Sequence, residues 1–235
     1  MTRPLLAIAG VGRSDVEEIA VRNGYALTDN LENAFIVAAA SPSREDMLRM
    51  MATEPPYALI ETPVPQSAFG QRLSRALEMR GLYMSLSTAT AFQVDLTSVL
   101  CSICSRRLPM SEERRYDIET AVDEALSNAM VHGNLDIASV LRNDPADFDL
   151  YCDLVNERLV TPLYATRRIE VLATWTPDSL DIEVHDEGRG YDISNFNTPP
   201  QLEAKCGRGF TLIRSLASNV TIAEHGRSLT MSFAP

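Results

Sequence analysis

Residues 121–134, AVDEALSNAMVHGN, combine a helical pattern with two polar side chains on one face. Glu124 and Asn128 are four residues apart, so a helix places them side by side. Small apolar residues are available to pack the other side of that helix: Ala121, Val122, Ala125 and Ala129. A carboxylate beside a carboxamide can activate a nucleophile or hold a magnesium ion. The alternative is a solvated polar stripe on an ordinary amphipathic helix.

The surrounding sequence predicts where this helix begins and ends. Pro109 separates it from an earlier helix at 94–108, and Ser111 is suited to be its N-cap because acidic residues follow in the first turn. Gly133 is suited to end it. We therefore predict a helix over 111–133.

After the Glu124 helix, the C-terminal part first becomes irregular and then shows apolar residues at every second position, as strands do. Residues 135–167 are irregular, with one short helix expected around 147–159. Four β-rich segments follow, at 168–175, 180–186, 219–225 and 229–233. Together with a strand at 82–88, they predict an α/β sandwich, whose mixed, mainly antiparallel sheet is backed by helices on one face.

The N-terminal part alternates short apolar runs with helical patterns, which is typical of parallel βαβ units in a small doubly wound domain. Gly10 and Gly12 after the first strand invite a dinucleotide-binding interpretation, but Asp15 stands where the third glycine of that motif belongs. We place a domain boundary near residue 81, giving domains at 1–81 and 82–235.

The order of these strands and helices resembles a receiver module of flavodoxin-like topology. The predicted strand 34–40 ends without the phosphoacceptor aspartate, and Glu61 is the only acid near a strand end in this part. We expect residues 1–81 to be a regulatory or dimerising domain without phosphotransfer chemistry.

Composition narrows the functional classes. The 235 residues carry a net charge of -11 and form no basic stripe, which argues against a nucleic-acid partner. The apolar start PLLAIAG is shorter than a signal-peptide core, and no apolar run reaches membrane-spanning length. We expect a cytoplasmic protein with no membrane contact.

Cys101 and Cys104 form a CxxC inside the helix predicted at 94–108. A redox pair or half of a zinc site is conceivable, but no second CxxC or histidine pair completes such a site. We expect buried cysteines in a reducing compartment.

Two glycine clusters lie downstream of the Glu124 helix. Asp186 ends a predicted strand and is followed by Gly188 and Gly190, an acceptor at a sheet rim with room for a flat ring or a phosphate. Gly207 and Gly209 precede a predicted helix, whose free N–H groups form an anion site. Each cluster alone is equally compatible with an ordinary turn or a capped surface helix.

In this order, the three clusters resemble the N, G1 and G2 boxes of the Bergerat-fold (GHKL) ATPases. The wording EALSNAMVHGN and GRGFTLI is most similar to anti-sigma-factor serine/threonine kinases of the RsbW type. The resemblance covers residues 82–235 and includes a helical insertion at about 135–167. No segment resembles the phosphoacceptor helix of a histidine kinase.

The resemblance implies a role for each position, with ATP and Mg²⁺ as cofactors. Glu124 would be the catalytic base, and Asn128 would bind the nucleotide through the magnesium ion. Asp186 would accept the adenine amino group, with Gly188 and Gly190 beside the ring. Gly207, Arg208 and Gly209 would belong to the phosphate lid, whose flexible part is expected at 193–206. Phe210 and Thr211 would also bind the nucleotide.

Two functions stay open, and a third interpretation, a sensor whose first domain controls an ATPase output, is compatible with either of them. The first is a Mg-dependent kinase that phosphorylates a STAS-type anti-anti-sigma factor. The second is a nucleotide-dependent binding protein that sequesters a sigma factor or another regulator without kinase activity. A homodimer is compatible with either function.

Overall fold

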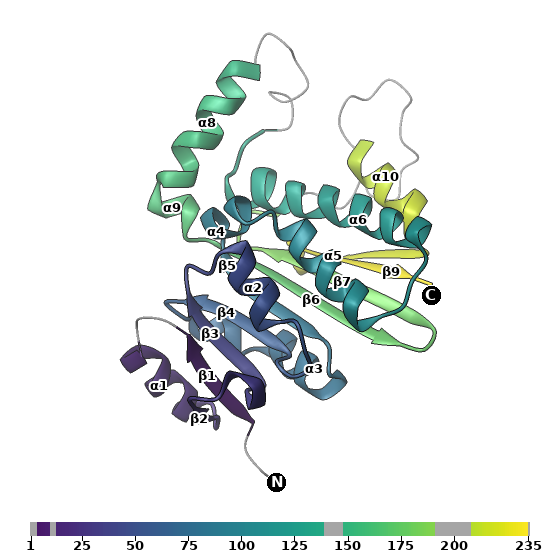
Figure 1. The fold of residues 1–235 in the computed structure, drawn as a ribbon. Helices are drawn as coiled ribbons and strands as arrows, with labels where there is room; N and C mark the ends of the chain where they lie inside the picture. Colours follow the sequence, from purple (N-terminus) through teal and green to yellow (C-terminus); the bar gives the residue numbers. More distant parts are fainter. Residues whose placement is uncertain (1–3, 10–12, 139–147, 191–207, 235) are drawn as a thin grey trace.

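The computed structural model describes residues 4–9, 13–138, 148–190 and 208–234. Within them the strands form one nine-stranded sheet in the order β2-β1-β3-β4-β5-β6-β7-β9-β8 (Figure 1). Pairing is parallel from β2 to β5 and antiparallel from β5 to β8. The mixed α/β architecture predicted from the sequence is confirmed.

The parallel half of the sheet comes from the N-terminal part of the chain. Its strands are β1 (Leu5–Ala9), β2 (Ala26–Thr28), β3 (Ile36–Ala40), β4 (Ala58–Thr62) and β5 (Leu82–Ser87). Their order, 2-1-3-4-5, is a common one for doubly wound sheets. The short 3₁₀ turns η1 (Leu31–Asn33) and η2 (Gln66–Phe69) connect elements of this half.

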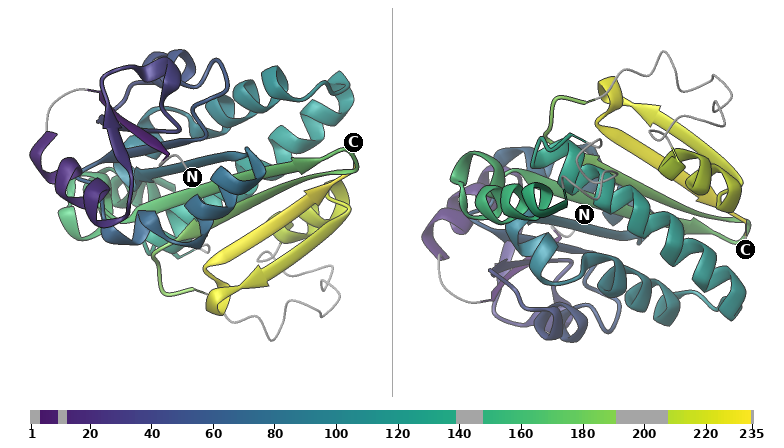
Figure 2. Two further views of the ribbon diagram at one scale, coloured as in Figure 1. Left: turned by 90° about the horizontal axis from the view of Figure 1, so that it is seen from below. Right: turned by 90° about the horizontal axis from the view of Figure 1, so that it is seen from above.

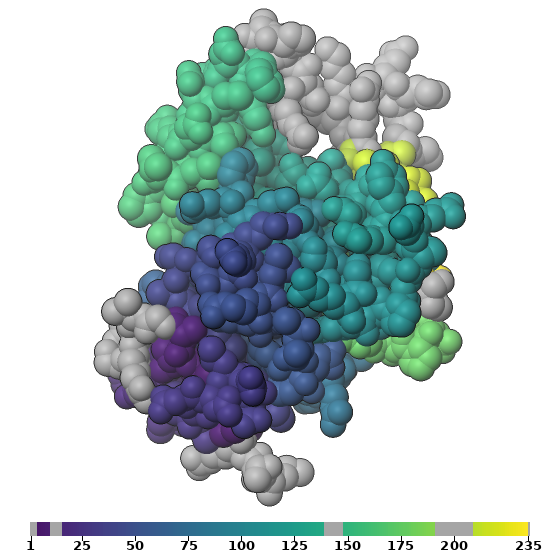
Figure 3. All heavy atoms as spheres, in the orientation of Figure 1, coloured from purple at the N-terminus to yellow at the C-terminus, as the bar shows by residue number. Residues whose placement is uncertain are grey.

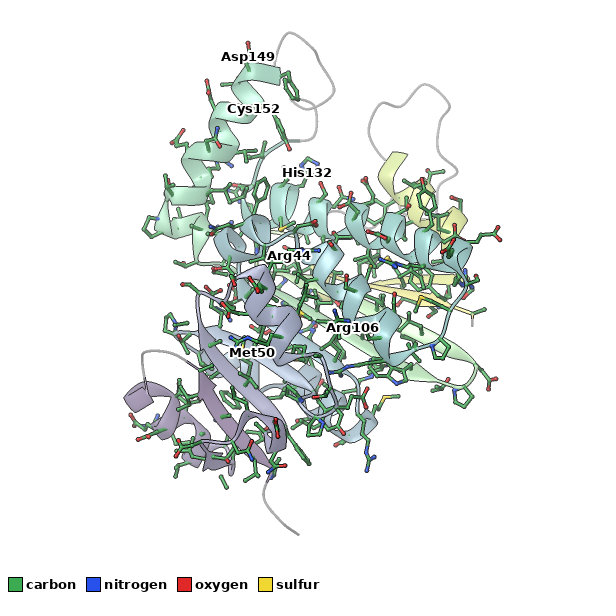
Figure 4. All side chains as sticks on the ribbon, viewed as in Figure 1. Arg44, Met50, Arg106, His132, Asp149 and Cys152 are labelled. Atoms are coloured by element: carbon green, nitrogen blue, oxygen red, sulfur yellow. The ribbon has the colours of Figure 1, made fainter. Side chains whose placement is uncertain are left out.

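Helices cover both faces of the parallel half. Helices α1 (Arg13–Arg22) and α3 (Gln71–Met79) pack on one face, which the view from below shows (Figure 2, left). Helix α2 (Arg44–Met50) packs on the opposite face through Met47. There it meets helix α5, where Arg44 Nη2 donates to Ser98 Oγ at 2.9 Å (Figure 4).

The antiparallel half carries its main helices on one face. Its strands are β6 (Arg168–Thr176), β7 (Ser179–Asp186), β8 (Asn219–Ala223) and β9 (Ser228–Phe233). Helices α5 (Leu96–Arg107), α6 (Glu112–Ser127) and α10 (Arg208–Leu216) cover it (Figure 2, right). The period-two pattern is confirmed, because Leu180, Ile182 and Val184 all point into this core.

Strand β5 joins the two halves. It pairs parallel with β4 and antiparallel with β6, so one sheet runs across the boundary predicted near residue 81. Buried Arg107 of α5 also reaches the N-terminal part, donating to the backbone oxygens of Met51, Thr53 and Pro56. The division into two domains stays a prediction, and the two parts share backbone pairing and buried contacts.

The helix that carries Glu124 begins as predicted but ends differently. Ser111 is its N-cap and accepts from Arg114 N. After Ser127 the chain continues as a π-helix, Asn128–Asn134 (η3). Gly133 was predicted to end the helix, but it lies inside this π-helix, where a Cβ would meet the Asp186 carboxylate.

The insertion projects from the body of the molecule (Figure 3). It contains α8 (Phe148–Val160), close to the predicted bounds of 147–159, and α9 (Pro162–Ala165). Both pack near α4 (Thr88–Gln93), a short helix that the sequence analysis did not predict. Large apolar side chains on the insertion are half exposed or more: Phe148, Leu150, Val160 and Leu163.

The cysteine prediction is consistent with the structure. Cys101 and Cys104 are buried and free in α5. Burial raises the pKa of both thiols, that of Cys104 to about 12, which keeps them protonated and unreactive. Across the described residues, His, Cys, Asp and Glu side chains nowhere gather in threes as a metal site would require. In the same residues, no helix combines the length and apolarity needed to cross a membrane.

Candidate nucleotide-binding site

Glu124 and Asn128 lie side by side where α6 passes into the π-helix. Asn128 Nδ2 donates to Glu124 Oε1 at 3.0 Å, and both side chains are half-buried. This bond uses the amide nitrogen of Asn128, so its Oδ1 remains the group for a further ligand. One carboxamide oxygen fits magnesium held mainly by phosphates and water, which needs few protein ligands.

The π-helix ends on Asn134, a fully buried residue that the site prediction missed. Asn134 Nδ2 donates to Thr88 Oγ1 at 2.8 Å and to the Arg168 carbonyl at 2.9 Å. Asn134 Oδ1 accepts from Glu187 N at 2.8 Å. The side chain therefore ties the end of the π-helix to the starts of α4 and β6 and to the segment after β7. The sequence did offer one indication of this role, because Asn134 is a polar residue directly after the glycine at the end of residues 121–134.

Asp186 ends β7 at the rim of the sheet and is 6% exposed. Asp186 Oδ1 accepts from Gly188 N at 2.8 Å, and its own N–H donates to Arg227 O at 3.0 Å. Burial raises the pKa of this carboxyl to about 6. A buried acceptor at a sheet rim can recognise an amino group.

Backbone contacts within the protein require glycine at 188 and 190, and Gly133 leaves room for the Asp186 carboxylate. A Cβ on Gly133 would lie 2.5 Å from Asp186 Oδ1, and one on Gly188 would lie 2.4 Å from Gly133 O. Gly190 has a left-handed φ of +72°, and its Cβ would lie 2.1 Å from His225 O. The segment from Asp186 to Gly190 is therefore packed between the π-helix and the turn η5 (Glu224–Gly226).

The start of α10, which carries Gly209 of the third cluster, lies against Glu124. A Cβ on Gly209 would lie 1.8 Å from Glu124 Oε1, so a larger residue there would require the Glu124 side chain to move. Phe210 packs against the core and Thr211 follows it in the first turn. Gly207 and the predicted lid at 193–206 lie outside the described residues, and so does the side chain of Arg208.

The predicted site residues that the structure describes thus form two contact groups. Glu124, Asn128 and Gly209 make the first, with a helix N-terminus beside a carboxylate. Asp186, Gly188 and Gly190 make the second, and Gly133 of the π-helix touches it. The π-helix connects the two groups, and such helical irregularities are frequent at functional sites.

Comparison with known families agrees with this geometry. The family model described as "Histidine kinase-like ATPase domain" matches residues 87–233, more than half of the chain. The chain belongs to this family. Its domain is an ATP-binding domain of the histidine kinase-like, GHKL type, and the match contains all three clusters. Comparison with the curated proteins gave no significant match.

The histidine kinase-like ATPase domain begins, by this match, at the last residue of β5. Strands β1 to β4 and helices α1 to α3 precede it, and of these α2 packs against α5 and α3 against β6.

Proposed function

We propose that this histidine kinase-like ATPase is a Mg-dependent serine/threonine protein kinase of the anti-sigma-factor, RsbW-like type. Its proposed substrate is a hydroxyl group of a small STAS-type protein. The observation that carries the proposal is Glu124, a carboxylate held beside Asn128 and under the first turn of α10. A protein that only binds nucleotide does not need a base there.

In this reaction the chain's own groups orient and deprotonate. The Glu124 carboxylate takes the proton of the attacking serine or threonine hydroxyl, whose oxygen bonds to the γ-phosphorus while the bond to the ADP oxygen breaks. Asn128 would hold the magnesium ion, which supplies charge neutralisation on the phosphates. Asp186 would accept from the adenine amino group.

The direct test uses purified full-length chain, γ-labelled ATP and a STAS-type protein. We expect magnesium-dependent label on the intact substrate and none on a variant whose acceptor serine is replaced by alanine. Absence of labelled protein, with hydrolysis of ATP alone, would contradict the kinase assignment.

A second candidate function is nucleotide-dependent sequestration of a sigma factor or another regulator. The half-exposed apolar side chains on α8 and α9 favour it, because exposed apolar surface is typical of protein-binding sites. Capture of a sigma factor that requires ATP, without phosphate transfer, would select this function.

We further propose that residues 1–81 are a receiver-like unit without phosphoacceptor function. The four strands within residues 1–81 follow the order 2-1-3-4, and β5, just past the predicted boundary, completes the receiver-like order 2-1-3-4-5. Glu61 is buried in β4 and its carboxylate accepts from Ser87 N and Thr90 Oγ1, with Arg168 Nη1 at 4.0 Å. A carboxylate engaged in this way links the unit to the ATPase domain and is not presented to a phosphodonor.

Replacing Asn128 by Ala is expected to weaken ATP binding about tenfold when magnesium is present, because a metal ligand is lost. Without magnesium, the variant and the wild type are expected to bind alike. Calorimetric titration with and without chelator measures both cases. Equal affinities in the presence of magnesium would refute the metal role of Asn128.

A further inference from the structure

Arg72, on helix α3 of the N-terminal part, contacts the face of the antiparallel sheet opposite α6. Its Nε donates to Glu183 of β7 at 2.7 Å and its Nη1 to Glu170 of β6 at 3.4 Å. Its Nη2 donates to Glu224 of the turn η5. One guanidinium therefore joins α3 to two strands and to a turn, with a side chain that is 19% exposed.

The turn that Arg72 contacts is also the turn that holds the Asp186 segment. Glu224 and His225 both have left-handed φ values, 52° and 58°, which side-chain-bearing residues rarely adopt. The backbone in and just after the turn meets both ends of the segment: His225 O of the turn lies against Gly190, and Arg227 O, between the turn and β9, accepts from Asp186 N. A shift of the backbone from Glu224 to Arg227 would therefore disturb both Asp186 and Gly190.

Arg72 makes the shortest ion pairs with Glu183 and Glu224, and Arg227 also contributes positive charge nearby. Arg75, one turn away on α3, is 4.0 Å from Glu183 and is half exposed. His185 Nδ1 lies 3.4 Å from Glu224, but burial lowers the pKa of His185 to about 4, so it is neutral near pH 7. Without Arg72, the carboxylates of Glu183 and Glu224 would lose their closest positive partner, and only the more distant Arg75 and the nearby Arg227 would offset their charges.

We propose that Arg72 is a positioning residue for nucleotide binding, acting through Glu224 to hold the turn η5 against the segment from Asp186 to Gly190. The N-terminal unit thereby sets the ATP affinity of the histidine kinase-like domain from the opposite face of the sheet. This inference rests on the proposed role of Asp186 in binding adenine. The competing explanation is a purely structural ion pair that keeps α3 on the sheet.

Glu224→Ala separates the two explanations. It cuts the link to the turn, while Arg72 keeps its bonds to Glu170 and Glu183 and so keeps α3 in place. We expect ATP binding by the full chain to weaken about five- to tenfold, the range of such coupling. The thermal midpoint without nucleotide is expected to stay close to that of the wild type.

Arg72→Ala is expected to weaken ATP binding to a similar degree, and Arg75→Ala is the matched control on the same helix. The control is expected to bind ATP within twofold of the wild type. The double variant with Arg72→Ala and Glu224→Ala is expected to be no weaker than the worse single variant, since both remove one link.

ATP binding by Glu224→Ala that equals the wild type would overturn the inference, and so would fully additive losses in the double variant. Should Arg72→Ala fail to fold, ATP binding by Glu224→Ala still distinguishes the positioning role from a purely structural ion pair. Failure of the wild type to bind ATP would instead refute the proposed function, so the two failures are distinguishable.

Discussion

Replacing Glu124 by Gln is expected to lower the rate of phosphate transfer at least 100-fold, while ATP binding stays within about twofold of the wild type. General-base catalysis contributes about 10²- to 10⁴-fold to rates, and glutamine cannot take a proton. Its side-chain oxygen can still accept the bond from Asn128 Nδ2. Single-turnover transfer from γ-labelled ATP to a STAS-type protein measures the rate, and calorimetry measures binding.

Glu119→Gln is the control for this experiment. It makes the same chemical change on the same helix, at a side chain that is 43% exposed and 4.0 Å from Arg115. The control is expected to transfer phosphate at the wild-type rate. Transfer by Glu124→Gln at the wild-type rate would remove Glu124 from its proposed role.

Replacing Asp186 by Asn is expected to weaken ATP binding about 10- to 100-fold and, at pH 7, to stabilise the protein without nucleotide. The loss of affinity follows because the carboxylate acceptor is lost, and a hydrogen bond to a charged group contributes about 1.5–3 kcal/mol. The gain in stability without nucleotide follows because a buried charge is removed. The asparagine oxygen can still accept from Gly188 N.

The sign of the stability change follows from the raised pKa of Asp186. Burial raises it from 3.8 to about 6, so the folded protein binds this proton more tightly than the unfolded chain. Ionisation of Asp186 therefore removes stability as the pH rises from about 4 to about 6, by about 1–3 kcal/mol. The advantage of Asp186→Asn is expected to be small near pH 4 and full at pH 7.

Urea unfolding at both pH values measures this difference. Asp181→Asn, on the same strand β7 at a half-buried position, is the control and is expected to show little change. A stability gap that does not depend on pH would contradict the assignment of the raised pKa to Asp186.

In the wild type, ATP binding is expected to tighten as the pH rises through about 6, since the ionised carboxylate is the better acceptor.

Local pattern was sufficient for most of the secondary structure and for the histidine kinase-like ATPase family. In β7 the residues from Ser179 to Val184 alternate between half-buried and buried because one face of the sheet packs against helices, and that alternation is visible in the sequence. The adjacency of Glu124 and Asn128 follows from helical spacing alone. The Ser111 cap is similarly local.

Features that depend on distant contacts could not be predicted in this way. The π-helix, with Gly133 inside it, forms where the end of α6 meets Asp186 and where Asn134 bonds to residues from distant parts of the chain. No periodicity in residues 121–134 encodes those partners. The continuous sheet through β5 likewise depends on pairing with β6, more than 80 residues further along the chain.

The sequence by itself determined the α/β class, the order of the elements and the three clusters of the ATP-binding family, because each depends on spacing within one element or motif. Only the tertiary structure decided that Gly209 lies on Glu124 and that Gly133 and Gly188 lie beside Asp186. It alone placed Arg72 against Glu224. These contacts join residues far apart in the chain, and such contacts form only when the sheet and its helices pack together.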